Sequence, residues 1–427
     1  MFRIKKRKHT ALALVFGCLG GLTACEDQPV SAGGGDPADS GKTVRTEIED
    51  LGEIHGRSFH EGRAVNNLGQ ITGVSRTTEP PESHSFFLWD EQGGMADLGR
   101  FKESAGGTVI PHAINDHGEI AGQDHPYAVI WSPASGFRVL GEGAAFGLNN
   151  NGLAVGYRTW PVGSQPRPLE GTQALLWDET GDQVVLETFS EKSGEPVERD
   201  WNQAFDINSH GQVVGYSVFP SGPVSGPRRA VIWEDAKIEH DLGTFGGSSE
   251  AFAINDSGQV VGQSEIEGGP ASRNRFFTVD SSMGKVSVED GPRRAAEPGY
   301  SQIVMANRSR AFIWDERNGM VNLGTKKEGP SLALDINNHG QVVGFILIPP
   351  DSARTNQVRA FYWDEDLGMT ILEPLDESFS FSFAYGINDE GIVTGRSSSA
   401  RAGHMQAVRW KISFEGEEIK PRIISVE

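Results

Sequence analysis

The chain has 427 residues, with 38 basic and 58 acidic side chains and two cysteines, Cys18 and Cys25. Its formal net charge of −20 disfavours nucleic acid and anionic lipid as main binding partners. Cys18 lies in an apolar N-terminal run that cleavage of an export signal would remove. Cys25 would then be the only cysteine, so no intrachain disulfide is expected. A domain of this size has enough core to be stable without one.

The first 42 residues predict an export signal followed by a flexible tether. Five basic residues among the first eight precede an apolar run, Ala11 to Leu22, that is too short to span a bilayer as a stable helix. The segment Leu-Thr-Ala-Cys ending at Cys25 resembles a bacterial lipobox, and the alternative is an ordinary secretory signal that contains a cysteine. We expect a lipoprotein signal peptide over 1–24 and a tether over 25–42.

A lipid on Cys25 would make this an exported, membrane-anchored lipoprotein that faces the periplasm or the cell surface. Removal of the signal leaves 33 basic and 58 acidic residues, a net charge of −25, which fits a soluble exported body. We expect no nucleic-acid partner and a monomeric protein.

Beyond the tether, an eight-residue motif occurs seven times, with Asn at its first position and Gly at its fourth and eighth. Apolar residues flank each polar turn, which predicts a hairpin that joins two short strands and whose first Gly takes positive φ. A motif spread evenly along the chain builds a scaffold and does not mark one active site. The copies begin at Asn66, Asn115, Asn149, Asn208, Asn255, Asn337 and Asn388.

Two further motifs complete each repeat. An apolar segment that ends in Trp, such as AFIWD at 311–315, follows every copy and predicts a third strand. A Leu-Gly segment, such as the one at Leu323, follows four of the copies and predicts a fourth strand. Four short strands per repeat without a 3.6-residue apolar period predict an all-β fold, a β-propeller of four-stranded blades, with a solenoid as the alternative.

The number of blades depends on one long interval. Successive copies lie 49, 34, 59, 47, 82 and 51 residues apart, so the fifth interval is long enough to contain a degenerate unit. There, Phe276–Asp280 aligns with the Trp motif and Ser301–Met305 aligns with the segment after the turn, which places the unit near Pro298. We therefore predict eight blades over 43–427, or seven if this stretch is only an insertion.

The ring is expected to close by pairing strands from the two ends of the chain in one blade, which removes a free sheet edge. The segment 46–52 is the N-terminal candidate for this closing strand. The segment from Glu417 to Val426 is the C-terminal candidate, weakened by Pro421.

The combined motif resembles the HAF family of bacterial extracellular repeats. The match is clearest from Asp241 to Gly262, DLGTFGGSSEAFAINDSGQVVG, and the resemblance covers roughly 46–414. The chain departs from the family in two ways. The unit near Pro298 has lost its turn Asn and both glycines, and Arg often stands at the position of the His in the His-Ala-Phe for which the family is named. The resemblance implies an exported repeat domain of unknown biochemical role.

The candidate binding residues lie in variable loops. In a four-stranded meander the second loop of each unit emerges opposite the Asn turns, and these loops vary most in length and are rich in Arg. An aromatic ring beside guanidinium groups can stack on a sugar while the Arg holds an anion. Alternatively, these Arg solvate strand ends and the Trp fill space under long loops. The candidates are Trp160, Trp201, Arg158, Arg228, Arg229, Arg273, Arg275, Arg354 and Arg359.

No catalytic residue, metal site or cofactor is predicted. The chain beyond the signal has no HExxH, no zinc-spaced cysteines and no Gly-x-Ser-x-Gly. Two turns with a leading Asp, at Asp206 and Asp335, lack the Glu that ends a calcium loop.

We expect a non-catalytic module that binds a glycan, peptide or partner protein. The alternative is a carbohydrate-active lyase or hydrolase with its site at the central channel. A deep central pocket with paired carboxylates, or with a His beside a Tyr, and with shifted pKa values would favour the enzyme. A narrow channel lined by small and apolar residues would favour the scaffold.

Overall fold

The computed structural model describes 44–77, 83–101, 108–162, 169–193, 201–220, 225–267, 275–280, 285–290, 302–306, 308–324, 329–348, 357–376, 379, 381–398 and 405–414. The chain divides into two parts, 1–36 and 37–427, and every described residue belongs to the second. The predicted signal, tether and Cys25 therefore lie outside the described residues. No helix among the described residues is long and apolar enough to cross a membrane.

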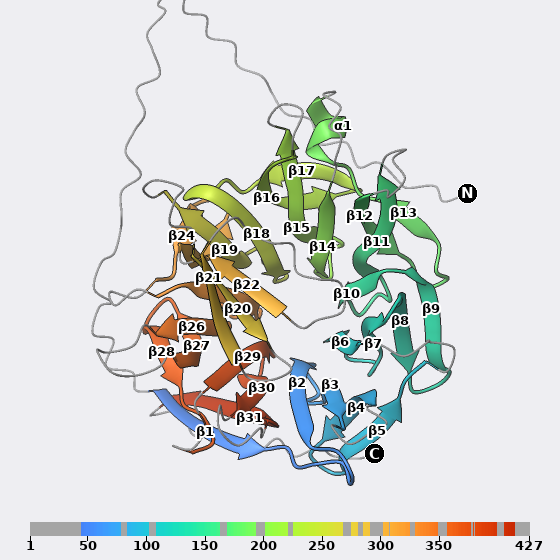
Figure 1. Cartoon of the computed structure of the whole chain (residues 1–427), viewed down its shortest axis with the longest axis vertical. Coiled ribbons are helices and arrows are strands. Elements are labelled where there is room, and N and C mark those ends of the chain that lie inside the picture. The colour runs from blue at the N-terminus through green and yellow to red at the C-terminus, as the bar shows by residue number, and fades with distance from the viewer. Residues whose placement is uncertain are drawn as a thin grey trace, which may run out of the picture. The chain divides into compact units, whose positions relative to one another are not determined.

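The described part of the chain is built from antiparallel sheets that follow one another in sequence order around a common centre (Figure 1). The first two four-stranded units, called units 1 and 2, confirm the predicted order of strand, Asn turn, strand, Trp strand and outer strand. Their strands are β2 (Phe59–Val65), β3 (Ile71–Arg76), β4 (His84–Asp90) and β5 (Gly94–Gly99), then β6 (Val109–Ile114), β7 (Ile120–Asp124), β8 (Tyr127–Ser132) and β9 (Gly136–Glu142).

Units 3 and 4 repeat this order, with a short helix, α1 (Phe189–Ser193), between them. Their strands are β10 (Ala144–Leu148), β11 (Ala154–Val162), β12 (Leu169–Trp177) and β13 (Gln183–Val185), then β14 (Asn202–Ile207), β15 (Val213–Pro220), β16 (Ser225–Glu234) and β17 (Lys237–Asp241).

Units 5 and 6 have the same order, although unit 5 carries a long insertion between its second and third strands. The strands are β18 (Gly246–Ile254), β19 (Val260–Ile266), β23 (Ser309–Asp315) and β24 (Gly319–Asn322), then β25 (Ser331–Ile336), β26 (Val342–Ile348), β27 (Gln357–Asp364) and β28 (Gly368–Leu372).

Unit 7 combines the two ends of the described chain. Its first three strands are β29 (Phe381–Ile387), β30 (Ile392–Ser398) and β31 (Met405–Phe414), and its outer strand is β1 (Val44–Asp50), which pairs antiparallel with β31. The predicted closure by an N-terminal strand is therefore confirmed, while 417–426 lies outside the described residues. An ion pair of 2.7 Å between Arg409 and Glu49 adds to the pairing of β1 with β31.

The predicted eighth blade is not found among the described residues. The aligned segments instead form a separate three-stranded sheet of β20 (Arg275–Asp280), β21 (Lys285–Asp290) and β22 (Gln302–Ala306). Strand β19 pairs directly with β23, and the N–H of Ile266 donates to the carbonyl of Arg308 at 3.1 Å, so unit 5 is complete without this sheet. Strands β20, β21 and β22 thus pair with one another and lie, in sequence, between the second and third strands of unit 5.

Replacing residues 268–306 by Asn-Gly, a dipeptide suited to a two-residue hairpin, is expected to leave the fold intact. Because β19 and β23 already pair up to Ile266 and Arg308, the thermal unfolding midpoint is expected to change by less than about 3 °C, or about 1 kcal/mol. Circular dichroism melting checks this. Loss of cooperative unfolding would instead mean that 268–306 supplies a blade that the ring requires.

The core lies between neighbouring sheets. Trp233 of β16, fully buried, packs in one cluster with Val155 and Ala174 of unit 3, and Trp410 of β31 packs against Tyr362 of unit 6 in another. Burial of such large aromatic side chains between sheets dominates packing energetics. Trp233 and Trp410 are thus packing residues between neighbouring sheets.

Candidate functional site

Each Asn of the repeated motif holds its own turn and contacts the next unit. Asn255, for example, accepts hydrogen bonds at Oδ1 from the N–H groups of Ser257 (3.1 Å) and Gln259 (2.9 Å). Its Nδ2 donates to the backbone carbonyl of Asn337 in unit 6 at 3.0 Å. The first Gly of the motif has positive φ in every copy, +77° at Gly258, as the turn prediction requires.

The amide-to-carbonyl bonds form a closed circuit. Each of the seven Asn side chains, 3–6% exposed, donates Nδ2 to the backbone carbonyl of the next Asn, and the last donates back to the first. The distance from Nδ2 of each donor to the carbonyl oxygen of the next Asn is 2.9 Å for Asn66, 3.3 Å for Asn115, 3.0 Å for Asn149, 3.2 Å for Asn208, 3.0 Å for Asn255, 2.9 Å for Asn337 and 2.9 Å for Asn388, which donates to Asn66.

The second Gly of the motif permits a β-bulge in the first strand of each unit. At Gly262, an added Cβ would overlap the carbonyl oxygen of Glu250, and equivalent overlaps occur at the other six copies. The pairing register shifts one residue in every first strand, in unit 5 between Ala251 and Ala253. A bulge leaves the extra residue out of the ladder and redirects its side chain.

The bulged residues of all seven units line one pocket at the centre of the first strands, with a volume of about 290 Å³. They lie three positions before each turn Asn. Their aromatic rings contact one another from unit to unit, with centroids 4.6, 5.3 and 5.4 Å apart for His112–Phe146, Phe146–Phe205 and Phe205–Phe252. The bulged residues are Arg63, His112, Phe146, Phe205, Phe252, Leu334 and Tyr385. We call this pocket the axial pocket.

The rim of the axial pocket is polar. It is formed by the residue after each turn Asn, and these residues are also hydrogen-bonded from unit to unit. The N–H of Ser209 donates to Asp256 Oδ1 at 2.9 Å, and the N–H of Asp389 donates to Asn67 Oδ1 at 3.0 Å. The rim residues are Asn67, Asp116, Asn150, Ser209, Asp256, Asn338 and Asp389.

Two carboxylates stand in the wall of the pocket where other units have Ala or Gly. Asp206 accepts from the N–H of Ile207 at 2.8 Å and, across to unit 5, from the N–H of Ile254 at 2.9 Å. Burial raises the pKa of Asp206 to about 6, with a contribution from Asp256, although both N–H groups stabilise the charged form.

Asp335 is placed in the same way. Its carboxylate accepts from the N–H of Ile336 at 2.9 Å and from the N–H of Ile387 in unit 7 at 2.7 Å. Burial raises the pKa of Asp335 to about 8, and the charges of Asp206 and Asp389 add to the effect. Both folded-state pKa values lie above the usual carboxyl value of about 3.9. The two groups therefore contribute most to the free energy of unfolding below about pH 3.9, and this contribution is lost as pH rises through 6 and 8.

A buried charge cluster supports the floor of the pocket at the junction of units 7 and 1. Glu61 pairs with Arg63 at 3.1 Å and with Arg396 at 3.4 Å. Burial alone would raise the pKa of Glu61, but these guanidinium groups lower it. Arg63 also lies over the ring of Tyr385, 4.8 Å from its centroid. Arg63 is therefore held in place by both a carboxylate and an aromatic ring.

His112 completes the polar part of the floor. Burial, with the charge of Arg63, holds the pKa of His112 well below its ordinary value. Burial raises the pKa of Tyr385. Both side chains are therefore neutral near pH 7. Among the residues that the structure describes, no group of three or more His, Cys, Asp or Glu side chains is arranged to hold a metal ion.

The Arg candidates whose side chains the structure describes do not line this pocket, and several of them have partners within the chain. Arg158 bonds Gln173 Oε1 at 2.5 and 2.9 Å, and Gln173 lies opposite it on the paired strand. Arg228 pairs with Glu250 and lies over the ring of Tyr216 at 4.4 Å.

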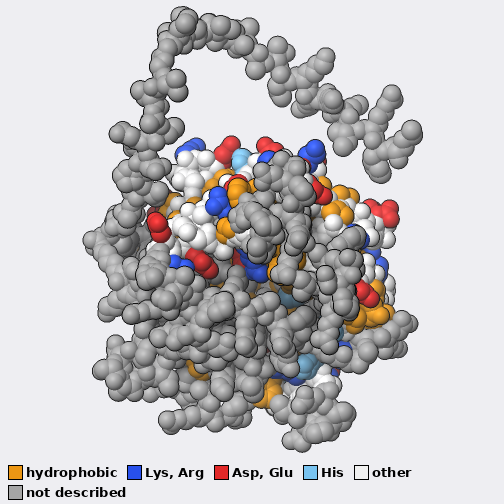
Figure 2. All heavy atoms as spheres, turned by 45° about the horizontal axis from the view of Figure 1, so that its top comes forward, with side chains coloured by type: hydrophobic (Ala, Val, Ile, Leu, Met, Phe, Trp, Pro, Cys, Tyr) orange, Lys and Arg blue, Asp and Glu red, His pale blue; other side chains and the backbone are white. Residues whose placement is uncertain are grey.

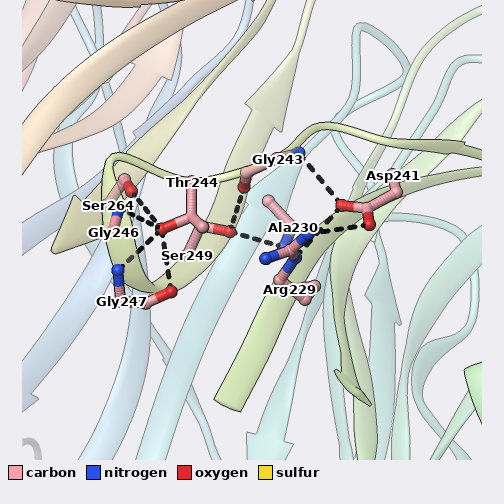
Figure 3. A network of polar contacts seen from close by, with 9 residues as sticks. All are labelled: Arg229, Ala230, Asp241, Gly243, Thr244, Gly246, Gly247, Ser249 and Ser264. Atoms are coloured by element: carbon pink, nitrogen blue, oxygen red, sulfur yellow. Dashed lines mark hydrogen bonds and ion pairs between the residues drawn. The ribbon is translucent and has the colours of Figure 1, made fainter. Parts of the chain in front are cut away.

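Arg229 belongs to a polar network built on the Leu-Gly-Thr-Phe-Gly-Gly-Ser segment (Figure 3). Its guanidinium contacts Asp241 at 3.2 Å. The Thr244 hydroxyl accepts from the N–H of Gly247 at 3.1 Å, and Ser249 Oγ donates to the carbonyl of Gly243 at 2.6 Å. These bonds hold the connection between β17 and β18, so this part of the family-like motif has a structural role.

The other candidates are only partly described. Arg359 is half-buried and donates to the carbonyl of Val358 at 3.2 Å, and Trp201 is half-buried at the start of unit 4. The side chains of Trp160 and Arg275, and the whole of Arg273 and Arg354, lie outside the described residues. On the visible surface, described Lys and Arg side chains stand beside Asp and Glu side chains (Figure 2).

Sequence reasoning missed the seven bulged residues. Their signal is present in the repeats, because the position three before the Asn holds Arg, His, Phe, Phe, Phe, Leu and Tyr in a strand that otherwise carries small or aliphatic residues around it. A position that is both large and variable inside a uniform strand is typical of a site that faces a cavity.

Comparisons with known proteins give likenesses of limited extent. A family model described as "Protein of unknown function (DUF3466)" matches 172–375, and no curated protein matches the chain. The β-propeller domain of the Trilobed protease from Pyrococcus furiosus is similar at 12% identity and a TM-score of 0.45, over 88% of this chain and 100% of that chain.

Two further solved structures are similar. A Pyrococcus horikoshii acylaminoacyl peptidase has 11% identity and a TM-score of 0.47, over 82% of this chain and 52% of that chain. A gluconolactonase from Xanthomonas campestris has 8% identity and a TM-score of 0.31, over 86% of this chain and 100% of that chain. At these identities and TM-scores, none of the likenesses carries an argument about the ligand or reaction of this chain.

Proposed function

We propose that this chain is an exported, seven-bladed β-propeller of the HAF-repeat kind, anchored by a lipid on Cys25 and acting as a non-catalytic binding module at the cell envelope. Seven units joined by the closed Asn circuit support the blade number. The N-terminal motif up to Cys25 supports the anchor and the location. Its ligand is a small polar molecule, or the polar tip of a glycan, peptide or partner protein.

The observation that carries the binding role is the axial pocket. It draws residues from all seven units, and its volume of about 290 Å³ is near the lower end of the range for small-molecule sites. Hydrogen bonds between neighbouring units fix the rim, and strand geometry fixes the floor, so the pocket is preformed. A preformed site avoids much of the ordering cost of binding.

Blocking the rim is expected to abolish binding without harming the fold. The Ser209 side chain makes no hydrogen bond within the described structure, and its backbone bonds do not depend on the side chain, so Ser209→Trp places an indole over the opening. Ser257→Trp is the matched control, since Ser257 is exposed on a neighbouring turn and does not line the pocket.

The measurement is a ligand-observed NMR screen of the purified full chain against saccharides, diamines and short peptides. At least one compound is expected to bind the wild type and Ser257→Trp but not Ser209→Trp. If every compound that binds the wild type also binds Ser209→Trp equally well, the axial pocket is not the site.

A carbohydrate-active enzyme is the second candidate, favoured by one observation. Asp206 and Asp335 share the axial pocket, and a carboxyl group with a pKa raised to between 6 and 8 suits general acid catalysis. Against this, both oxygens of each carboxylate already accept backbone N–H groups. Cleavage of a bound saccharide by the wild type, lost in Asp335→Asn while binding persists, would favour the enzyme.

A further inference from the structure

We infer that the axial pocket selects ligands that carry a primary ammonium group on a flexible alkyl chain, such as a small diamine or a lysine side chain. This inference rests on the proposed function, because it concerns the ligand of the same pocket. Three features support it: the balance of charge around the pocket, a buried tyrosine hydroxyl beside it, and the apolar rings of its floor.

Carboxylates dominate the charge around the pocket. Among the residues that the structure describes, five carboxylates and one cationic side chain line the pocket. That side chain, Arg63, already pairs with Glu61 at 3.1 Å. His112 and Tyr385 are held neutral by burial, and Asp335, whose pKa is raised to about 8, is charged mainly above that pH. The carboxylates are Asp116, Asp206, Asp256, Asp335 and Asp389. An anionic ligand would meet repulsion here and a cation attraction.

The Tyr385 hydroxyl is a buried polar group beside the pocket, within hydrogen-bonding reach of Glu61. Tyr385 lines the pocket, is only 9% exposed, and makes no hydrogen bond of normal geometry through its Oη. Glu61 is near enough for its charge to add to the effect of burial in raising the Tyr385 pKa. The O–H can donate to Glu61, which leaves the lone pairs of the oxygen to accept an N–H from a ligand.

The floor suits an alkyl chain. The rings of Phe146, Phe205 and Phe252 adjoin one another, with centroids 5.3 and 5.4 Å apart. Aromatic rings bind methylene groups through burial and attract an ammonium group through their faces. Carboxylates around an aromatic floor therefore favour an organic cation over a strongly hydrated metal ion.

The pH dependence of binding follows from the same charges. The charge of Asp256 adds to burial in raising the pKa of Asp206 to about 6, and the charges of Asp206 and Asp389 add to burial in raising the pKa of Asp335 to about 8. A bound cation offsets the repulsion, so binding releases protons and tightens as pH rises through this window. Binding of a neutral ligand would lack this dependence.

The experiment is isothermal titration calorimetry of the purified full chain with three probes. These are 1,5-diaminopentane, Nα-acetyl-lysine amide and, as the neutral analogue, 1,5-pentanediol. Both amines are expected to bind and the diol is not, with weaker binding at pH 5.5 than at pH 8. Binding of the diamine alone would identify a small amine as the source of the group, and binding of the lysine derivative alone would identify a peptide side chain.

Charge removal is tested in matched variants. Asp256→Asn combined with Asp389→Asn is expected to weaken amine binding about tenfold, or about 1.4 kcal/mol, because both charges are lost. The amide Oδ1 at each position can still accept the hydrogen bond from the backbone N–H of the neighbouring unit. Glu179→Gln combined with Glu316→Gln removes the same charge from exposed turns outside the pocket lining and is expected to change nothing. Thermal unfolding confirms that each variant is folded.

The outcomes separate the two proposals. If neither amine binds, or the diol binds as well as the amines, the ammonium inference is wrong. The proposed function then still stands provided that another ligand from the screen is lost in Ser209→Trp and kept in Ser257→Trp. If the amines bind Ser209→Trp as tightly as the wild type, both the ammonium inference and the assignment of the pocket are wrong.

Discussion

Replacing Asn255 by Asp is expected to destabilise the protein by about 3 to 5 kcal/mol at pH 8, the cost typical of an uncompensated buried charge. The Asn255 Nδ2 donates to the carbonyl of Asn337 at 3.0 Å and to Gln259 Oε1 at 2.8 Å. An aspartate oxygen there would face two acceptors in a site that is 4% exposed. The loss breaks the circuit to the next unit, while an oxygen at the Oδ1 position still accepts the two turn N–H groups.

The loss is expected to be smaller at acidic pH. A protonated carboxyl group at this position could donate one of the two missing bonds, so its folded-state pKa would be raised and the stability of the variant would fall as pH rises. Urea unfolding at pH 5 and pH 8 measures both effects. Asn318→Asp is the control, since Asn318 donates Nδ2 to Asp315 at 2.8 Å on an exposed turn where water can replace the bond. Equal losses in the two variants would mean that the circuit contributes nothing special.

Replacing Gly262 by Ala is expected to cost about 3 kcal/mol, at the upper end of the usual overpacking penalty. An added Cβ would overlap the carbonyl oxygen of Glu250 and lie 3.0 Å from the Cα of Ala251, and both neighbours are backbone atoms of the bulged strand. Relief requires the two strands to separate or the bulge to shift. Either change moves Phe252 and so deforms the pocket floor.

The turn glycine of the same repeat is the matched control. Gly258 has φ of +77° and open space around its Cα, with only Gln212 Oε1 at 3.9 Å from an added Cβ, so Gly258→Ala is expected to cost about 1 to 2 kcal/mol of backbone strain. Chemical unfolding of the two variants gives the comparison. A cost for Gly262→Ala no greater than that for Gly258→Ala would contradict the assigned role of the second glycine.

Local features of the fold could be predicted from the sequence because they depend on neighbouring residues. The Asn-to-Gly spacing specifies a turn, and the structure has positive φ at each first Gly. The Trp segments predict strands, and Trp177, Trp233 and Trp410 are buried in them. The closing strand was also predictable, since 46–52 has strand character outside any repeat, and β1 (Val44–Asp50) pairs with β31.

The pairing of the strands in the long fifth interval could not be obtained in this way. Phe276–Asp280 has the sequence pattern of the third strand of a unit, and it does lie in a strand, β20. Whether a strand belongs to the ring depends on its pairing partner, and β20 pairs with β21 and β22, while β19 pairs with β23, far along the chain. The local sequence pattern does not show which strand β19 or β20 pairs with.

The axial pocket could not be predicted from the sequence for a related reason. Residue type and loop position indicate the Arg candidates, whereas their partners follow from strand register, as for Arg158 opposite Gln173. The axial pocket arises from a bulge that seven distant strands share, and the residues that it gathers lie in seven separate repeats. The buried carboxylate of Asp335 gives no sequence signal beyond a polar residue where other repeats have Ala or Gly.

The central claim is that ligand enters the axial pocket on the side of the Asn turns and does not bind the Arg-rich loops on the opposite side. The most direct test compares binding of one screened ligand to Ser209→Trp, Ser257→Trp and the double variant Trp160→Ala with Trp201→Ala. The account predicts that only Ser209→Trp loses binding. Loss of binding in the double variant, with Ser209→Trp unaffected, would contradict it and place the site on the Arg-rich loops.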